Sequence, residues 1–101
     1  MVPMVEVKVR FFTNLREIVN KREQTLTFPE NEKVTVNKVL KTLTQQYGKA
    51  FVDYVYDGKT GQVRGFLQFL VNGTSTSTLD GLDTELRDRD VLAILPPVGG
   101  G

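Results

Sequence analysis

The strongest pattern in this sequence is an apolar stripe with the period of an α-helix, and it restricts the architecture of the whole chain. The stripe occupies positions i, i+3, i+4, i+7 and i+11 of one segment, namely Val36, Val39, Leu40, Leu43 and Tyr47. Thr35 is the expected N-cap of this helix, and Gly48 stands where a left-handed C-cap is favoured. A helix with one apolar face must bury that face against a second layer of structure.

The N-terminal segment predicts the first strands of that layer. Apolar and charged residues alternate strictly over residues 5–11, which indicates a strand with one buried face. Residues 24–28 alternate again, so the two strands should form a hairpin-like pair. A short helix is expected between them, with Asn14 as its N-cap and Glu17 as the partner in a capping box.

The C-terminal half supplies further strands. Residues 51–56 are apolar but without a period, and could form either a strand or irregular packing. Residues 66–71 are a short apolar run that predicts a strand, which the turn signal of Asn72 and Gly73 closes. Residues 91–95 predict the last strand.

The order of these elements predicts an α+β protein of the β-grasp, ubiquitin-like architecture. A mixed sheet of four to five strands would pack on one long helix. The strand after the helix and the last strand would both lie beside the first strand. At 101 residues the chain has the length of a single domain, 1–101, in which residues 96–101 form an extended, flexible glycine tail.

The composition excludes several classes of function. The chain has no cysteine and no histidine, so it cannot carry a thiolate nucleophile or an iron–sulfur cluster, and a ferredoxin of similar fold is excluded. A formal charge of +1 offers no dense basic surface to nucleic acid or to an anionic membrane. Neither a membrane span nor a signal peptide is recognisable, so we expect a cytoplasmic protein without an active site of its own.

Two motifs could carry chemistry but are better explained as loops. Residues 58–60, Gly-Lys-Thr, resemble the end of a phosphate-binding loop, but Asp53 stands where that loop requires glycine, so a turn is expected over 57–61. The acidic stretch 80–90 lacks the spacing of a calcium loop and is interrupted by arginines. A solvated loop with local ion pairs is therefore favoured over a cation site, with a tight turn within 79–86.

The C-terminus has a composition that favours entry into another protein. Pro96 and Pro97 stop the last strand, and the chain ends on Gly99, Gly100 and Gly101. Prolines make a short stiff stalk, and glycines can thread a channel too narrow for other residues. The terminal carboxylate could thus reach a partner's active site, whereas the alternative is a frayed end or a linker remnant.

The chemistry of such a tail requires other proteins. A free α-carboxyl group has a pKa of about 3.5, so near neutral pH it is an anion and a poor electrophile. Group transfer from it needs prior activation, most simply adenylation with ATP. The chain has no phosphate loop for ATP and no thiol for sulfur, so the activating enzyme and the sulfur donor must lie elsewhere.

With these features the chain resembles the MoaD/ThiS family of ubiquitin-like sulfur carriers over nearly its whole length. The similarity is carried by the strand 7–12, residues 15–17, the amphipathic helix and the segment 69–73. Its most specific part is 86–101, where an acidic turn precedes the last strand, two prolines, a valine and the terminal diglycine. The paired prolines favour the MoaD branch, the small subunit of molybdopterin synthase, over the thiamin branch.

The resemblance implies a mechanism that depends on Gly100 and Gly101. A MoeB/ThiF-like enzyme would adenylate the Gly101 carboxylate with ATP, and a sulfur donor would convert it to a thiocarboxylate. A MoaE-like large subunit would take up the tail and pass the sulfur to the pterin precursor of the molybdenum or tungsten cofactor. This chain itself would bind no cofactor and no metal.

A second branch of the same family implies a different acceptor. In archaeal modifier proteins the activated Gly101 would join lysine amines, or its thiocarboxylate would feed tRNA thiolation. Gly99 stands where the molybdopterin branch often carries threonine, and residues 53–63 form a longer stretch than in compact bacterial relatives. Both features leave the modifier function open.

Partners are expected to dock around the base of the tail. The expected contact residues, which Arg10 or Arg64 would assist, are Phe12, Leu95, Pro96, Pro97, Val98 and Gly99. Residues 66–71 and 92–95 also hold more apolar side chains than one face of a sheet needs. Either the uncovered face binds partners, or the segment 51–63 covers it as part of a two-sided core.

Overall fold

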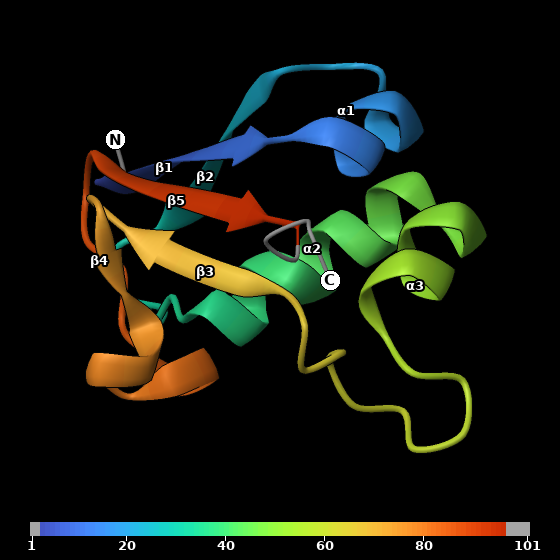
Figure 1. The fold of residues 1–101 in the computed structure, drawn as a ribbon. Helices are drawn as coiled ribbons and strands as arrows, with labels where there is room; N and C mark the ends of the chain where they lie inside the picture. The colour runs from blue at the N-terminus through green and yellow to red at the C-terminus, as the bar shows by residue number, and fades with distance from the viewer. Residues whose placement is uncertain (1–2, 97–101) are drawn as a thin grey trace.

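The computed structural model describes residues 3–96. These residues form a mixed five-stranded sheet of order β2-β1-β5-β3-β4, with α2 passing behind the sheet in the view of Figure 1. The strands are β1 (Met4–Phe11), β2 (Glu23–Pro29), β3 (Gln68–Val71), β4 (Thr74–Ser75) and β5 (Asp90–Leu95). The α-helices are α1 (Thr13–Val19), α2 (Val36–Tyr47) and α3 (Lys49–Val55), and two 3-10 turns are η1 (Thr76–Thr78) and η2 (Gly81–Asp83). The α+β class, the mixed sheet and the β-grasp architecture are confirmed.

The parallel pair of β1 and β5 forms the centre of the sheet. Val9 lies opposite Leu92 and Phe11 opposite Ile94, and all four side chains are buried. The charged residues that alternate with them on β1 are exposed, so the predicted one-sided burial is confirmed. β2 pairs antiparallel with β1 along its length, which confirms the hairpin-like pair.

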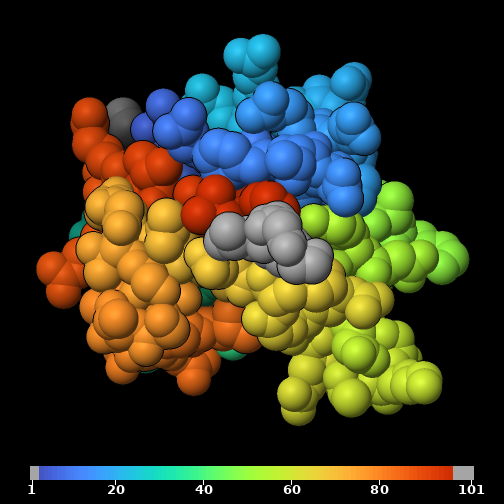
Figure 2. Space-filling view, in the orientation of Figure 1, coloured from blue at the N-terminus to red at the C-terminus, as the bar shows by residue number. Residues whose placement is uncertain are grey.

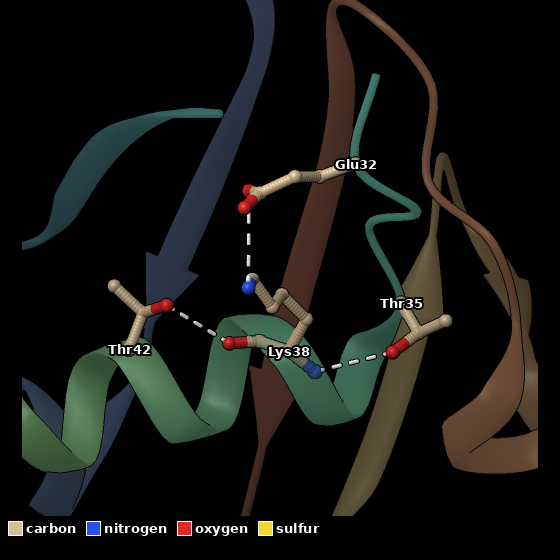
Figure 3. Close-up of polar contacts among 4 residues, drawn as sticks. All are labelled: Glu32, Thr35, Lys38 and Thr42. Atoms are coloured by element: carbon tan, nitrogen blue, oxygen red, sulfur yellow. Dashed lines mark hydrogen bonds and ion pairs between the residues drawn. The ribbon is translucent and has the colours of Figure 1, made fainter. Parts of the chain in front are cut away.

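Helix α2 begins and ends at the residues that its sequence predicts, although the Gly48 backbone, with a ψ of -146°, is not in the left-handed αL conformation. The Thr35 hydroxyl accepts the N–H of Lys38 at 3.2 Å, as Figure 3 shows, and the Lys38 carbonyl accepts the Thr42 hydroxyl at 2.9 Å. Gly48 has a φ of 76° and donates its N–H to the Thr44 carbonyl at 2.9 Å. The apolar stripe of α2 is buried except for Tyr47, which is half-buried.

The predicted cap of helix α1 is wrong. The helix begins at Thr13, Phe12 occupies its N-cap, and no side chain caps it. The first turn instead closes through the backbone, because the N–H of Leu15 donates to the Phe12 carbonyl at 3.2 Å. Asn14 therefore lies inside the helix. Because Phe12 directly follows β1, the chain turns into the helix as soon as it leaves the sheet.

The prediction of one long helix on the sheet is incomplete, because residues 49–55 form a separate helix, α3. Phe51 and Val55, at i and i+4, are fully buried, and the N–H of Val52 donates to the Gly48 carbonyl at 3.1 Å. The rings of Phe51 and Tyr47 lie 6.3 Å apart between centroids. This segment lacked a visible period because Val52 and Tyr54, on other faces, are also apolar and half-buried.

The predicted neighbour of β3 is also wrong. β3 pairs antiparallel with β5 rather than lying beside β1, because β2 and β5 occupy the two edges of β1. The strand begins at Gln68, two residues later than expected. The turn at Asn72 and Gly73 is confirmed, with φ values of 51° and 86°. The tight turn predicted within residues 79–86 is present as the 3-10 turn η2.

The burial of α2 against the sheet predicts the effect of a core substitution. Leu40 is fully buried on the sheet-facing side of α2, whereas its neighbour Lys41 is exposed. We expect Leu40→Ala to lower the free energy of unfolding by about 2–5 kcal/mol, since it leaves a cavity. Lys41→Ala, in the same helix, should change it by less than about 0.5 kcal/mol. Urea unfolding followed by circular dichroism would measure both, and equal effects would contradict this account of the core.

Candidate functional site

The base of the tail follows the central strand of the sheet. β5 is the third of five strands, and Gln68 on β3 lies opposite its last residue, Leu95. Pro96, the last residue that the structure describes, is half-buried. Pro97, Val98, Gly99, Gly100 and Gly101 lie outside the described residues, so the predicted tail sites are known here only by the position of its base.

An aromatic residue and an arginine lie at the end of β1, on one side of the tail base. β1 and β5 are parallel with Phe11 opposite Ile94, so Phe12 follows β1 where Leu95 ends β5. Phe12 is half-buried, and the Arg10 guanidinium carbon lies 5.6 Å from its ring centroid. This arrangement is a cation–π contact. The sequence-predicted residues Phe12, Leu95, Pro96 and Arg10 therefore come from two adjacent strand ends.

A second aromatic pair lies before β3, on the other side of β5 in the strand order. Phe66 is 45% exposed, and its ring centroid lies 6.4 Å from that of Tyr54 on α3. The Arg64 guanidinium does not join Arg10, because its Nη2 donates to the Asp53 carbonyl at 3.1 Å. The structure thus places the two candidate arginines on different sides of the sheet centre.

The apolar excess predicted for the last strands divides between the two faces of the sheet. Phe69, Val71, Leu92 and Ile94 are buried on the face that the helices cover. The alternate residues of β3 and β5 occupy the opposite face, where they are half-buried: Leu70, Val91, Ala93 and Leu95. We call these four residues the outer apolar row. Figure 2, in the orientation of Figure 1, shows the uncovered side, where segments of β1, β5 and β3 lie next to one another.

The outer apolar row is bordered by charge. In the sheet register Lys8 lies opposite Val91, and Arg10 lies opposite Ala93. Lys8 also pairs with Glu23 on β2 at 3.3 Å, which leaves Arg10 beside the tail base. A half-buried apolar row with a basic border has the composition of a transient protein interface, which is apolar at its centre and polar at its rim.

Carboxylates in the acidic stretch before β5 accept hydrogen bonds from backbone N–H groups. Asp88 accepts the N–H of Glu6 at 2.9 Å, and Asp90 accepts the N–H of Arg87 at 2.8 Å. Arg89 lies 4.0 Å from the Asp88 carboxylate, so a local ion pair is present as predicted. Within residues 3–96, no group of three acidic, cysteine or histidine side chains is arranged to hold a metal ion.

Residues 57–61 form the turn expected from the sequence. The Asp57 carboxylate accepts the N–H of Lys59 at 2.7 Å and that of Thr60 at 3.3 Å. These two backbone hydrogen bonds favour the ionised form and hold the pKa of Asp57 below its ordinary value. The Gly-Lys-Thr triplet is therefore part of a turn that the Asp57 carboxylate holds in place.

The fold and the position of the tail define a ubiquitin-like protein with the β-grasp fold. The elements that define it are the central parallel pair β1 and β5, the helix α2 across one face, and a C-terminal segment that continues the central strand. The chain belongs to the ThiS family, whose model matches residues 9–101.

Individual relatives cover almost the whole chain. It is 32% identical to small archaeal modifier protein 3 of Haloferax volcanii over 97 residues, which are 96% of this chain and 100% of that protein. The solution structure of small archaeal modifier protein 1 from Methanosarcina acetivorans matches with 39% identity and a TM-score of 0.75, over 98% of this chain and 99% of the other. A Pyrococcus furiosus structure, described as a proposed molybdopterin converting factor subunit 1, matches with 26% identity and a TM-score of 0.72, over 93% and 99%.

Sequence reasoning missed the aromatic contact between Tyr54 and Phe66. Tyr54 belongs to α3, which was not predicted, so the side chain could not be placed next to the run that begins at Phe66. The spacing of Phe51 and Val55, at i and i+4, is the signal that could have identified this helix.

No α-helix within residues 3–96 is both long and apolar enough to cross a membrane.

The hydrogen bonds of Asp57 predict a pH dependence. A carboxyl whose pKa is lowered on folding stabilises the protein above its unfolded-state pKa, and this stabilisation is lost as the pH falls through the folded-state pKa. We expect the wild type to lose more stability than Asp57→Asn between neutral and strongly acidic pH. Lys21→Ala, an exposed change that removes no carboxylate, should follow the wild type. Urea unfolding over a pH series would contradict this if all three proteins gave parallel curves.

Proposed function

We propose that this chain is a ubiquitin-like protein modifier and sulfur carrier whose reactive group is the carboxylate of Gly101. The observation that carries the proposal is a diglycine, Gly100 and Gly101, that follows the central strand β5 in the sequence of a ThiS-family β-grasp fold. Proteins named small archaeal modifiers match almost the whole chain at 39% and 32% identity, whereas the Pyrococcus furiosus protein matches at 26%, which favours the modifier function over that of a molybdopterin synthase subunit.

The proposed chemistry begins with activation by a MoeB/ThiF-like enzyme. The Gly101 carboxylate attacks the α-phosphorus of ATP, pyrophosphate leaves, and an acyl adenylate forms. A lysine amine of a target protein then attacks the acyl carbon, so that an isopeptide bond forms and AMP leaves. When a hydrosulfide ion released by a sulfur donor attacks the acyl carbon instead, AMP leaves in the same way and the product is a thiocarboxylate. ATP belongs to the partner enzyme, and this chain binds no cofactor of its own.

The second candidate function is the small subunit of molybdopterin synthase. It is favoured by the similarity to the Pyrococcus furiosus protein described as a proposed molybdopterin converting factor subunit 1. In that function the Gly101 thiocarboxylate enters a MoaE-like large subunit and gives its sulfur to the pterin precursor. Both functions use the same activation and place the protein in the cytoplasm.

The proposed docking residues surround the base of the tail. Phe12, Leu95 and Pro96 lie at the adjacent ends of β1 and β5, and Leu95 is itself part of the outer apolar row. Pro97, Val98 and Gly99 continue from there toward the reactive end. An aromatic side chain at the end of a strand, with Arg10 over its ring, has the character of an interface anchor.

The reach of the tail predicts how activation depends on its last residue. Deleting Gly101 leaves a glycine carboxylate but shortens an extended chain by about 3.3 Å. We expect ATP–pyrophosphate exchange with the cognate activating enzyme to fall about a hundredfold or more, because the carboxylate no longer reaches the nucleotide. The exposed variant Lys21→Ala should keep full exchange. Equal exchange by wild type and deletion variant would overturn the proposal.

The docking residues predict a change in KM rather than in kcat. We expect Phe12→Ala to raise the KM of the activating enzyme for this protein about tenfold, with kcat nearly unchanged, because the variant loses docking contacts and keeps its tail. Leu79→Ala removes another exposed apolar side chain and serves as the control. An unchanged KM for Phe12→Ala would exclude this strand end from the docking surface.

A further inference from the structure

A groove lies between α2 and α3, away from the tail base. It has a volume of about 540 Å³, and its lining includes Lys33, Lys38, Lys41, Thr44, Val52 and Tyr56. Ligand sites in proteins commonly occupy 300–1,000 Å³. The residues of α2 that pack on the sheet are a different set, so the groove opens on the part of α2 that the sheet leaves uncovered.

The two walls of the groove differ in character. On the α3 side, Val52 and Tyr56 stand at i and i+4 and are half-buried, so they form an apolar wall. On the α2 side, Lys38, Lys41 and Thr44 succeed one another at three-residue intervals. At a rise of 1.5 Å per residue this polar wall runs about 9 Å along the helix.

The positive charge of the groove is largely uncompensated. Lys38 approaches Glu32 at 3.8 Å, as Figure 3 shows. Neither Lys33 nor Lys41 has a carboxylate within 4.0 Å among residues 3–96. A concave surface with two unpaired ammonium groups and an apolar wall is complementary to an occupant that carries both carboxylates and a bulky apolar side chain.

We propose that this groove docks an acidic, amphipathic helical segment of a partner protein. The occupant lays carboxylates along the lysines of α2 and inserts an apolar side chain against Val52 and Tyr56. A helix with these two stripes repeats them at the spacing of the groove walls. A single phosphate is a poorer match, because the lysines are distributed along the groove rather than converging on one point.

This second surface goes beyond the proposed function, because it does not involve the tail. The outer apolar row lies on the face of the sheet opposite the helices and Phe12 follows the end of β1, whereas the groove belongs to the helical layer. A partner held in the groove therefore leaves the end of β5 accessible. The protein could remain bound to one partner while its tail reacts in another.

The test uses the full chain and a synthetic peptide. The probe is a helical peptide of about 14 residues with glutamates along one stripe and leucines along the next. A second peptide carries glutamine at each glutamate. Fluorescence anisotropy measures binding, and amide chemical shifts in two-dimensional NMR locate it and verify that each variant is folded.

Two double variants distinguish binding in the groove from an effect of the protein's net charge. Lys33→Glu with Lys41→Glu changes the groove, and Lys21→Glu with Lys59→Glu changes exposed lysines outside its lining. Each Lys→Glu change removes two units of positive charge, so both double variants move from +1 to −3. We expect the groove variant to bind the acidic peptide about tenfold or more weakly, and the matched control to bind within about twofold of the wild type.

The remaining readouts decide the location and the ligand class. The acidic peptide should shift amides of α2 and α3 and not those of β1 and β5, and the glutamine peptide should bind much more weakly. Equal losses in both double variants, shifts on the sheet, or equal binding of both peptides would overturn the proposal. So would failure of the peptide together with saturable binding of ATP or pyrophosphate at the same lysines, which would indicate a small-anion site.

Discussion

The parallel pairing of β1 with β5 is the constraint on which the rest of the structure depends. Parallel neighbours cannot be joined by a tight turn, so the chain between them has to cross over the sheet, and α2 makes that crossing. The same pairing fixes where the chain ends, because two parallel strands finish at the same edge. Val9 opposite Leu92 and Phe11 opposite Ile94 set that register with fully or almost fully buried side chains. The C-terminal segment consequently starts beside Phe12.

This geometry gives the two layers of the protein separate surfaces. The sheet has one face sealed by helices and another that exposes a half-buried apolar row with Lys8 and Arg10 at its border. The helical layer has a groove in which Lys38 pairs with Glu32, whereas Lys33 and Lys41 have no carboxylate within 4.0 Å among residues 3–96. The net charge of +1 does not reveal this separation of charge between the surfaces. Acidic residues are concentrated before β5, where their carboxylates accept backbone N–H groups. Local charge, rather than total charge, therefore determines which partners each surface suits.

The sequence was sufficient to predict an element of the fold where the spacing of its apolar residues matches the face that the structure buries. The stripe of α2, its Thr35 cap and the alternation of β1 are each set by short-range physics, and the structure confirms them. Helix α3 was hidden because Val52 and Tyr54 make its other faces apolar as well, which removes the period. The place of β3 beside β5 is a property of long-range pairing that no local pattern encodes. The structure confirms the predicted last residues of β1 and β5, Phe11 and Leu95, whereas the candidate tail residues 97–101 lie outside the described part of the chain.

The proposed function depends above all on one reactive group, the C-terminal carboxylate, which other proteins activate and transfer. The most direct measurement is the intact mass of the protein after incubation with ATP, its cognate activating enzyme and a sulfur source, with a lysine-containing acceptor in a parallel sample. The account predicts one oxygen-for-sulfur exchange located at Gly101 in the first sample and an isopeptide-linked product in the second. An unchanged mass in both samples, with an enzyme shown to activate another carrier, would contradict it.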